Sequence, residues 1–485
     1  MDITQTTLIE IREAIAARKV SAVELTRAYL DRIEKLDGDL HAYDDVYAER
    51  ALERARQVDA GQITGSLAGV PIAIKDNLCT DWGTTKNSSR MLENFRAPYT
   101  ATAVARLEAA GAIILGKTNM DEFAMGSSTE NSAFGRTKNP WDPDRVPGGS
   151  SGGSAAAMAA DLCAAAIGSD TGGSIRQPAA LCNIVGLKPT YGRISRWGLV
   201  AFASSLDQIG PLTHTVADTA AMMYAMSGHD PLDSTSANVP VPNYVEHLEA
   251  PIDNLRIGIG KQYMSDANDP AVTAAIQEAI EIYRSHGAQI VEVDLPHTEY
   301  GIPVYYIVAP AEASSNLARY DGVHYGYRSP SATTLAEVYY KSRGEGFGDE
   351  VKRRIMLGTY ALSSGYYDAY YLRALKVRRL IKNDFDRAFE QCDAILCPTT
   401  PGPAFRAGEK VDDPLQMYLN DIYTVNGNLA GIPAVSLPAG FAQVDGRKLP
   451  IGIQLYAPAF HESKLLRIAR LYEAATEYWK VRPAL

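Results

Sequence analysis

Apolar and polar positions near the N-terminus alternate with the period of an α-helix. Between Thr7 and about Arg56, apolar residues recur every three or four positions, which is the spacing of one buried helix face. Ser21 precedes the second of these periodic runs, and a serine there can accept a backbone N–H at a helix start. The pattern therefore predicts helices over roughly the first 60 residues, packed on the rest of the chain.

Beyond this region, the pattern of apolar residues predicts strands that alternate with helices. LAGVPIAIKDN (67–77) is an apolar run rich in β-branched residues and predicts a buried strand ending at Lys75 and Asp76. Further strand–helix alternations cover 102–119 and 255–296, and a tyrosine-rich helical stretch near 346–380 precedes buried strands at 393–398, 429–440 and 449–458 and a helix from about Glu462. This order is typical of an α/β fold. We find no repeats and no low-complexity linker, so one domain over 1–485 is expected, with a proline-rich surface connection at 231–245.

Composition narrows the class of protein. The net charge is −10 and the pI about 5.4, so the average surface repels phosphate and a dedicated nucleic-acid binder is disfavoured. Contact with RNA through a partner stays open, as does a small basic patch at Lys352, Arg353 and Arg354. The five cysteines show no C-x-x-C spacing, so neither a disulfide framework nor a zinc site is indicated. The N-terminus lacks signal-peptide character, and no run approaches the ~18 apolar residues of a membrane span. A cytoplasmic protein is expected.

Two glycine–serine segments are the candidates for chemistry: PGGSSGGSAAA (147–157) and GSDTGGSIRQP (168–178). A flexible loop is the plain interpretation of the first, but an alanine-rich helical run follows it directly. The segment lacks the lysine of a P-loop. It matches G-x-S-x-G around Ser151, yet no strand precedes it, as a nucleophile elbow requires. Asp170-Thr171-Gly172 resembles half of an aspartic-protease site, but there is no second copy.

A serine nucleophile needs a base. None of the eight histidines lies in either glycine–serine segment, although residues distant in sequence can still meet in space. A buried lysine can replace histidine when desolvation lowers its pKa far below about 10.4. Lys75 ends an apolar strand, where burial is expected. It is therefore a candidate base, with an ordinary buried or solvated lysine as the alternative.

The combination of VPIAIKDN, PGGSSGGSAAA and GSDTGGSIRQPA resembles the amidase signature family over nearly the whole chain. The resemblance implies an α/β fold with a large mixed central β-sheet covered by helices on both faces. It also implies a Ser-Ser-Lys triad, in which Ser174 is the nucleophile, Ser150 the bridging residue with a cis peptide bond before it, and Lys75 the base. The backbone N–H groups of Thr171, Gly172, Gly173 and Ser174 are implied as the oxyanion hole.

Three other stretches are similar to the family members that serve as the glutaminase subunit of a tRNA-dependent amidotransferase: 188–211, 353–371 and 417–438. That likeness implies glutamine as substrate, with Arg354 receiving its α-carboxylate and Asp421 its α-amino group, and Tyr305 nearby. Met125, Gly126 and Ser127 are implied as pocket residues. Without the likeness, Arg354 and Asp421 would be interpreted as surface charges on helices.

The same likeness implies partners. Ammonia is expected to pass to a B subunit that amidates misacylated tRNA with ATP and magnesium, and a small C subunit is expected to complete a heterotrimer. No metal and no cofactor are expected in this chain. Two alternatives stay open: a stand-alone amidase of the same family acting on small amides, and a catalytically silent scaffold.

Overall fold

A single mixed sheet organises the protein. The computed structural model describes residues 2–411 and 413–485, and within them eleven strands join in the order β1-β3-β2-β4-β6-β5-β10-β11-β9-β7-β8. Their bounds are β1 Tyr43–Val46, β2 Pro71–Lys75, β3 Ile113–Thr118, β4 Ala165–Asp170, β5 Val185–Lys188, β6 Gln208–Thr213, β7 Arg256–Gly260, β8 Gln289–Val293, β9 Ala394–Pro398, β10 Ala434–Val444 and β11 Arg447–Tyr456.

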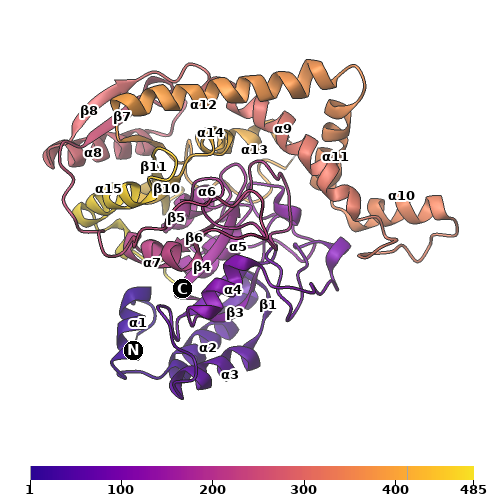
Figure 1. The fold of residues 1–485 in the computed structure, drawn as a ribbon, viewed down its shortest axis with the longest axis horizontal. Helices are drawn as coiled ribbons and strands as arrows, with labels where there is room; N and C mark the ends of the chain where they lie inside the picture. The colour runs from indigo at the N-terminus through magenta and orange to yellow at the C-terminus, as the bar shows by residue number, and fades with distance from the viewer. Residues whose placement is uncertain (1, 412) are drawn as a thin grey trace.

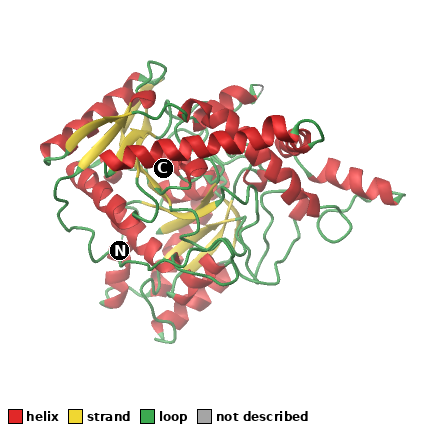
Figure 2. Cartoon of the chain, turned by 45° about the horizontal axis from the view of Figure 1, so that its top comes forward, coloured by secondary structure: helices red, strands yellow, loops and turns green. Residues whose placement is uncertain are grey.

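Helices surround this sheet, and Figure 2 shows them on both of its sides. Their bounds are α1 Leu8–Ala16, α2 Ala22–Leu40, α3 Ala48–Asp59, α4 Thr102–Ala109, α5 Gly152–Ala159, α6 Arg176–Cys182, α7 Val216–Met226, α8 Pro270–Ser285, α9 Gly301–Asn316, α10 Leu335–Gly346, α11 Asp349–Leu362, α12 Arg373–Gln391, α13 Pro414–Tyr418, α14 Val425–Ala430 and α15 Glu462–Ala475. The expected α/β fold with a large mixed sheet is confirmed.

The N-terminal helices form as the apolar pattern predicts. Ser21 caps α2: its side chain accepts the backbone N–H of Glu24, and the Glu24 side chain accepts the N–H of Ser21. This reciprocal capping satisfies two donors that a helix start leaves free. The three helices α1 to α3 lie together at one end of the molecule, in indigo in Figure 1.

At the opposite end, α10 and α11 extend beyond the sheet, and α12 runs toward them from the strands β7 and β8. In Figure 1 the long α12 runs across the top, α11 descends from its right-hand end, and α10 projects outward. A π-helical turn at Tyr367–Leu372 leads into α12. No helix in the described residues is long and apolar enough to cross a membrane.

Three adjacent strands bring the predicted catalytic segments together. β2 pairs in parallel with both β3 and β4, so their carboxyl ends meet at one edge of the sheet, where ligand sites of such sheets commonly lie. Lys75 ends β2, and Asp170 ends β4. The first glycine–serine segment leads into α5 and the second joins β4 to α6, so both segments start or finish at this edge.

Candidate active site

The first glycine–serine segment is tightly packed and buried, which rules out the flexible-loop interpretation. Residues 147–157 are all buried. A Cβ added at Gly149 would lie 2.2 Å from a carboxylate oxygen of Asp121, and one at Gly152 would lie 2.2 Å from the Thr129 hydroxyl. Glycine is therefore required there by close approach. The Gly149–Ser150 peptide bond is cis, as the family resemblance implies.

Lys75 contacts the serines of both segments. Its side chain is fully buried, and its Nζ donates to Ser150 Oγ at 2.7 Å, to Ser151 Oγ at 2.9 Å and to Ser169 Oγ at 3.0 Å. Ser169 also accepts from the side-chain amide of Asn77 at 2.9 Å. The lysine amino group therefore lies within proton-transfer distance of Ser150.

Burial sets the protonation of Lys75. Removal from water lowers the pKa of Lys75 to about 7, against the opposing attraction of Asp121, Asp170 and Asp207. Desolvation disfavours the charged form of an amine. A substantial fraction of Lys75 is then neutral near pH 7, as a base must be.

Two other buried lysines show what distinguishes Lys75. Burial also lowers the pKa of Lys117, and it lowers that of Lys188 to about 7. However, Lys117 donates to the Leu78 carbonyl and to Thr85, and Lys188 donates to the Pro189 carbonyl. Among the described residues, Lys75 alone of the three is hydrogen-bonded to the glycine–serine segments. Hydrogen bonds to serine, and not burial, therefore distinguish Lys75 from Lys117 and Lys188.

Ser174 lies in a loop that a buried ion pair holds in place. Asp170 pairs with Arg176 at 3.0 Å and also accepts the backbone N–H groups of Gly173 at 2.8 Å and Ile175 at 3.3 Å. Burial alone would raise the pKa of Asp170, but the Arg176 guanidinium outweighs this and holds it at about 2. Asp170 therefore stays ionised and fixes both sides of Ser174.

The structure places the two glycine–serine segments side by side through the backbone. The Ser151 N–H donates to the Ser174 carbonyl at 3.1 Å, and Ser174 is 7% exposed. Within residues 2–411 and 413–485, the Ser174 hydroxyl forms no hydrogen bond, and its link to Ser150 is not closed. Hydrogen bonds of this kind often tighten only when substrate binds.

The expected oxyanion hole lies on the same loop. The Gly173 N–H donates to Asp170 at 2.8 Å, which fixes the loop at this position. The N–H groups of Thr171, Gly172, Gly173 and Ser174 stay the predicted donors. Gly172 is itself fixed, because Thr424 donates to its carbonyl at 2.6 Å.

Arg354 is buried, contrary to the surface-charge interpretation. Its Nε donates to Glu350 at 2.7 Å, one turn earlier in α11. The guanidinium lies 5.3 Å from the ring centroid of Tyr306 and 5.6 Å from that of Tyr418. Among the described residues, the two terminal nitrogens have no hydrogen-bond partner. They form a fork that can receive a carboxylate with two parallel hydrogen bonds.

Asp421 is buried beside the Ser174 loop. One of its carboxylate oxygens lies 3.3 Å from the position of a Cβ built on Gly173, and the other accepts from the Ser127 hydroxyl. Burial raises the pKa of Asp421 to about 7. The Tyr305 ring lies against Gly172, 2.7 Å from a Cβ built there. The structure thus brings Asp421, Ser127 and Tyr305 to the loop that carries Ser174.

The loop 121–131 forms a further part of the candidate active site. Asp121 accepts the backbone N–H groups of Thr129 at 2.9 Å and Asn131 at 3.3 Å. Met125 is fully buried, and Gly126 has a φ of +157° and lies against the Asp121 carboxylate. Ser127 is held by Gln177, which donates to its carbonyl at 2.9 Å.

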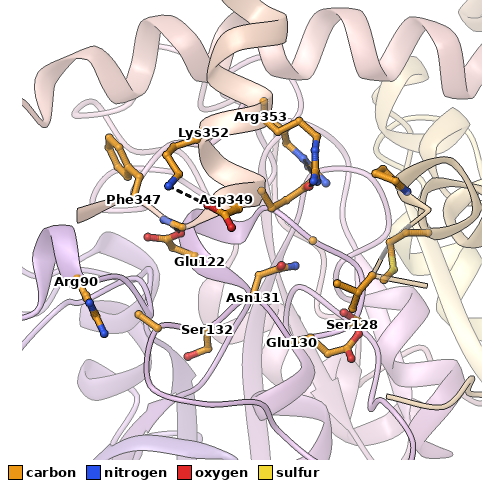
Figure 3. A pocket seen from close by; sticks show the side chains of 18 of the residues that line it. Arg90, Glu122, Ser128, Glu130, Asn131, Ser132, Phe347, Asp349, Lys352 and Arg353 are labelled. Atoms are coloured by element: carbon orange, nitrogen blue, oxygen red, sulfur yellow. Dashed lines mark hydrogen bonds and ion pairs between the residues drawn. The ribbon is translucent and has the colours of Figure 1, made fainter. Parts of the chain in front are cut away.

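A cavity of about 630 Å³ opens beside this loop (Figure 3). Its walls come from the loop 126–133, the junction of α10 and α11, and the segment around α13. Gly126 and Arg354 both line it. The other expected substrate residues, Met125, Ser127, Tyr305 and Asp421, and the catalytic residues Lys75, Ser150 and Ser174 do not line this cavity.

Sequence reasoning missed four supporting residues: Ser169, Asp170, Arg176 and Glu350. Ser169 and Asp170 end a buried strand, as Lys75 does, and that position was the available signal. Glu350 stands four residues before Arg354, which is the spacing of a helical ion pair. No group of three or more His, Cys, Asp or Glu side chains in the described part of the chain is arranged to hold a metal ion.

Comparison with known proteins bears on the family to which the chain belongs. The sequence profile of the amidase family matches residues 24–466. A relative from Heliobacterium modesticaldum, named as the A subunit of glutamyl-tRNA(Gln) amidotransferase, is 58% identical over 471 residues, covering 96% of each chain. The crystal structure of the protein of that name from Thermotoga maritima has 41% identity and a TM-score of 0.82, covering 100% of this chain and 98% of that one.

A further solved relative has a different printed activity. It is a peptide amidase in complex with the competitive inhibitor chymostatin, with 32% identity, a TM-score of 0.84 and complete coverage of both chains. The fold, the matched profile and the full-length relatives all agree with the resemblance found in the sequence. The chain belongs to the amidase family.

Proposed function

We propose that this chain is the glutaminase subunit of a tRNA-dependent amidotransferase. Ser174 attacks the side-chain amide of glutamine, and the ammonia released serves a partner that converts Glu-tRNA(Gln), and Asp-tRNA(Asn) where a cell makes it, to the amidated form. The observation that carries the proposal is a buried carboxylate, Asp421, beside the Ser174 loop, together with a buried guanidinium fork, Arg354, whose positive charge opposes the effect of burial on the pKa of Asp421. A free amino acid needs both receptors. The names of the full-length relatives support it.

The chemistry follows from the contacts of Lys75. Neutral Lys75 accepts a proton from Ser150, Ser150 accepts one from Ser174, and the Ser174 oxygen attacks the amide carbon. The hydrogen bond of 2.7 Å between Lys75 and Ser150 supports the first step. The same protons then move back to the departing nitrogen, leaving a γ-glutamyl ester on Ser174 and ammonia. Water attacks the ester in the second half, and glutamate leaves.

Charge that develops on the carbonyl oxygen requires donors fixed in advance. The N–H groups of Thr171, Gly172, Gly173 and Ser174 are the candidates, and hydrogen bonds to Asp170 and from Thr424 hold that loop in place. Loss of one such donor commonly costs about 3–4 kcal/mol in the barrier.

Partners complete the reaction. We propose that a B subunit takes the ammonia and uses ATP and magnesium to activate the side-chain carboxylate of the misacylated tRNA, and that a small C subunit completes a heterotrimer. The net charge of −10 supports assigning most tRNA contact to a partner. This chain then needs no cofactor of its own.

A stand-alone amidase is the second candidate, because a peptide amidase shares the fold. The test is to purify the chain with and without candidate B and C subunits and to assay ammonia release from glutamine and from aryl amides. Our proposal expects glutaminase activity and co-purification of partners. Strong partner-independent turnover of aryl amides without glutaminase activity would favour the second candidate.

Replacement of Arg354 by lysine tests the carboxylate receptor. Lysine keeps the charge but loses the fork, so one of two charge-assisted hydrogen bonds is lost, each worth about 1.5–3 kcal/mol. We expect the KM for glutamine to rise about 10- to 100-fold with a smaller change in kcat, measured by steady-state glutaminase assay. An unchanged KM would remove Arg354 from substrate binding.

We expect glutaminase activity to fall steeply as the pH is lowered, because two groups of the site titrate near pH 7. Lys75 must be neutral to act as base and Asp421 must be ionised to bind an ammonium group, and burial brings both pKa values to about 7. We therefore expect log kcat/KM to fall below pH 7 with a slope approaching 2, and log kcat with a slope near 1, since bound glutamine keeps Asp421 ionised. Both should level off above pH 8. A kcat/KM profile independent of pH between 6 and 8 would contradict the assignment.

A further inference from the structure

Glu122 is a buried carboxylate for which the proposed chemistry has no role. Its side chain is 2% exposed. One oxygen accepts the backbone N–H of Gly348 at 2.8 Å, and the other accepts from the Ser89 hydroxyl. Gly348 immediately precedes α11, and Figure 3 shows Glu122 beside the start of that helix, near Lys352. Glu122 therefore joins the loop 121–131 to the helix that carries Arg354.

The junction is close-fitting. A Cβ built on Gly348 would lie 2.5 Å from the bound carboxylate oxygen of Glu122. The next residue, Phe123, packs edge-on against Phe347, with ring centroids 5.6 Å apart. A carboxylate is also favoured beside a helix N-terminus. Two consecutive loop residues thus contact the two residues that lead into α11.

The residue on the other side of Glu122, Asp121, is hydrogen-bonded to the catalytic residue Ser150. The Asp121 N–H donates to the Ser150 carbonyl at 3.2 Å. Residues 121 and 122 therefore connect Ser150 directly with the N-terminus of α11. Arg354 lies in the second turn of that helix, so its distance from the reacting serines depends on this short connection.

We infer that Glu122 is a positioning residue that sets the separation between the serine pair and the α-carboxylate receptor Arg354. This inference rests on the proposed function. The contact acts on recognition of the carboxylate, because it fixes α11 rather than the serines, which Lys75 and Asp170 hold independently. Small misplacements of a binding group can cost large factors in rate or affinity.

The test compares two amides in the purified complex at pH 8.5. Glutamine carries the α-carboxylate, and 4-aminobutanamide is the same molecule without it. For Glu122→Ala we expect the KM for glutamine to rise at least about tenfold, while kcat/KM for 4-aminobutanamide stays within about threefold of the unmodified protein. Loss of uniform binding raises KM with kcat nearly unchanged. Glu122→Gln keeps an oxygen that accepts the Gly348 N–H, so it should restore most of the glutamine KM.

Asp349→Ala is the matched control. Asp349 is the first residue of α11, its side chain is 91% exposed, and it pairs with Lys352. Its replacement removes a negative charge from the same helix start without breaking the junction, so the glutamine KM should stay within about threefold. If Glu122→Ala does not fold, Gly348→Ala tests the same contact, since its methyl group must displace the Glu122 carboxylate.

The outcomes separate the two proposals. Equal losses on both amides in Glu122→Ala, or an unchanged glutamine KM in both Glu122→Ala and Gly348→Ala, would overturn the positioning role. If the unmodified protein itself cleaves 4-aminobutanamide as well as glutamine, the proposed glutaminase function fails instead. A selective loss of glutamine affinity that Glu122→Gln reverses would support Glu122 as a positioning residue.

Discussion

Ser174→Ala is expected to abolish glutamine-dependent activity, with a loss of about 10⁴-fold or more in kcat, because the only attacking oxygen is removed. The side chain is small and Asp170 holds its loop through backbone N–H groups, so the fold should survive. Amidation of misacylated tRNA by the complex should persist when ammonium chloride replaces glutamine. The two reactions are measured in parallel, by ammonia release and by tRNA amidation.

The ammonium-driven reaction is the internal control for this variant. It shows that the complex has assembled and that the partner's site is intact. If Ser174→Ala still amidates tRNA with glutamine at an appreciable rate, the nucleophile is another residue. If both reactions disappear although the complex forms, the chain contributes to the partner's chemistry as well, and the proposed division of labour is wrong.

Lys75→Met is expected to lower kcat by about 10²–10⁴-fold, the usual contribution of general acid–base catalysis. Methionine fills much of the buried volume but cannot accept a proton, and the hydrogen bond to Ser150 is lost. Binding of glutamine should change little, because Lys75 lies on the serine side of the site. The measurement is steady-state glutaminase kinetics, with thermal unfolding to check the fold.

Lys188→Met provides the matched control, since Lys188 is equally buried and its pKa is also lowered to about 7. It donates to a backbone carbonyl and not to a catalytic serine. We expect kcat within about threefold of the unmodified protein, with any cost appearing in the unfolding temperature. Equal losses of kcat in the two variants would mean that burial of charge, and not a base at Lys75, explains the effect.

Much of the fold could be predicted from hydrophobic spacing. The strand ending at Lys75, the helix after Ser21 and the final helix at Glu462 lie where the pattern places them. Apolar periodicity reports which face of an element is buried, and that information is local. The order of the eleven strands is not local, because β10 and β11 pair with strands more than 50 residues earlier. The mixed sheet was predicted only from the resemblance to the family.

The site could be predicted only as a combination. Lys75, Lys117 and Lys188 are three buried lysines, and no property of their own sequence neighbourhoods shows which one meets a serine. Arg354 stands in a run of three cations, and only the fold reveals that it is buried among Phe202, Tyr306 and Tyr418. The resemblance to the family singled out these residues, because the motifs of a family mark side chains that lie together in the fold even when they are far apart in the sequence.

The details that sequence could not supply are contacts between distant loops. The hydrogen bond from the Gly173 N–H to Asp170 fixes the loop that carries Ser174. The junction of Glu122 with Gly348 joins residues 226 positions apart. Each depends on hydrogen bonds whose partners are set by the assembled fold, so neither has a signature in the order of residues alone.

The most direct measurement of the central claim is the mapping of the covalent intermediate. The complex is mixed with isotopically labelled glutamine, quenched in acid during turnover, digested and analysed by mass spectrometry. We predict a labelled glutamyl ester on the peptide that contains Ser174, and no ester in Ser174→Ala. A labelled ester on any other residue, Ser150 and Ser151 included, would contradict this assignment.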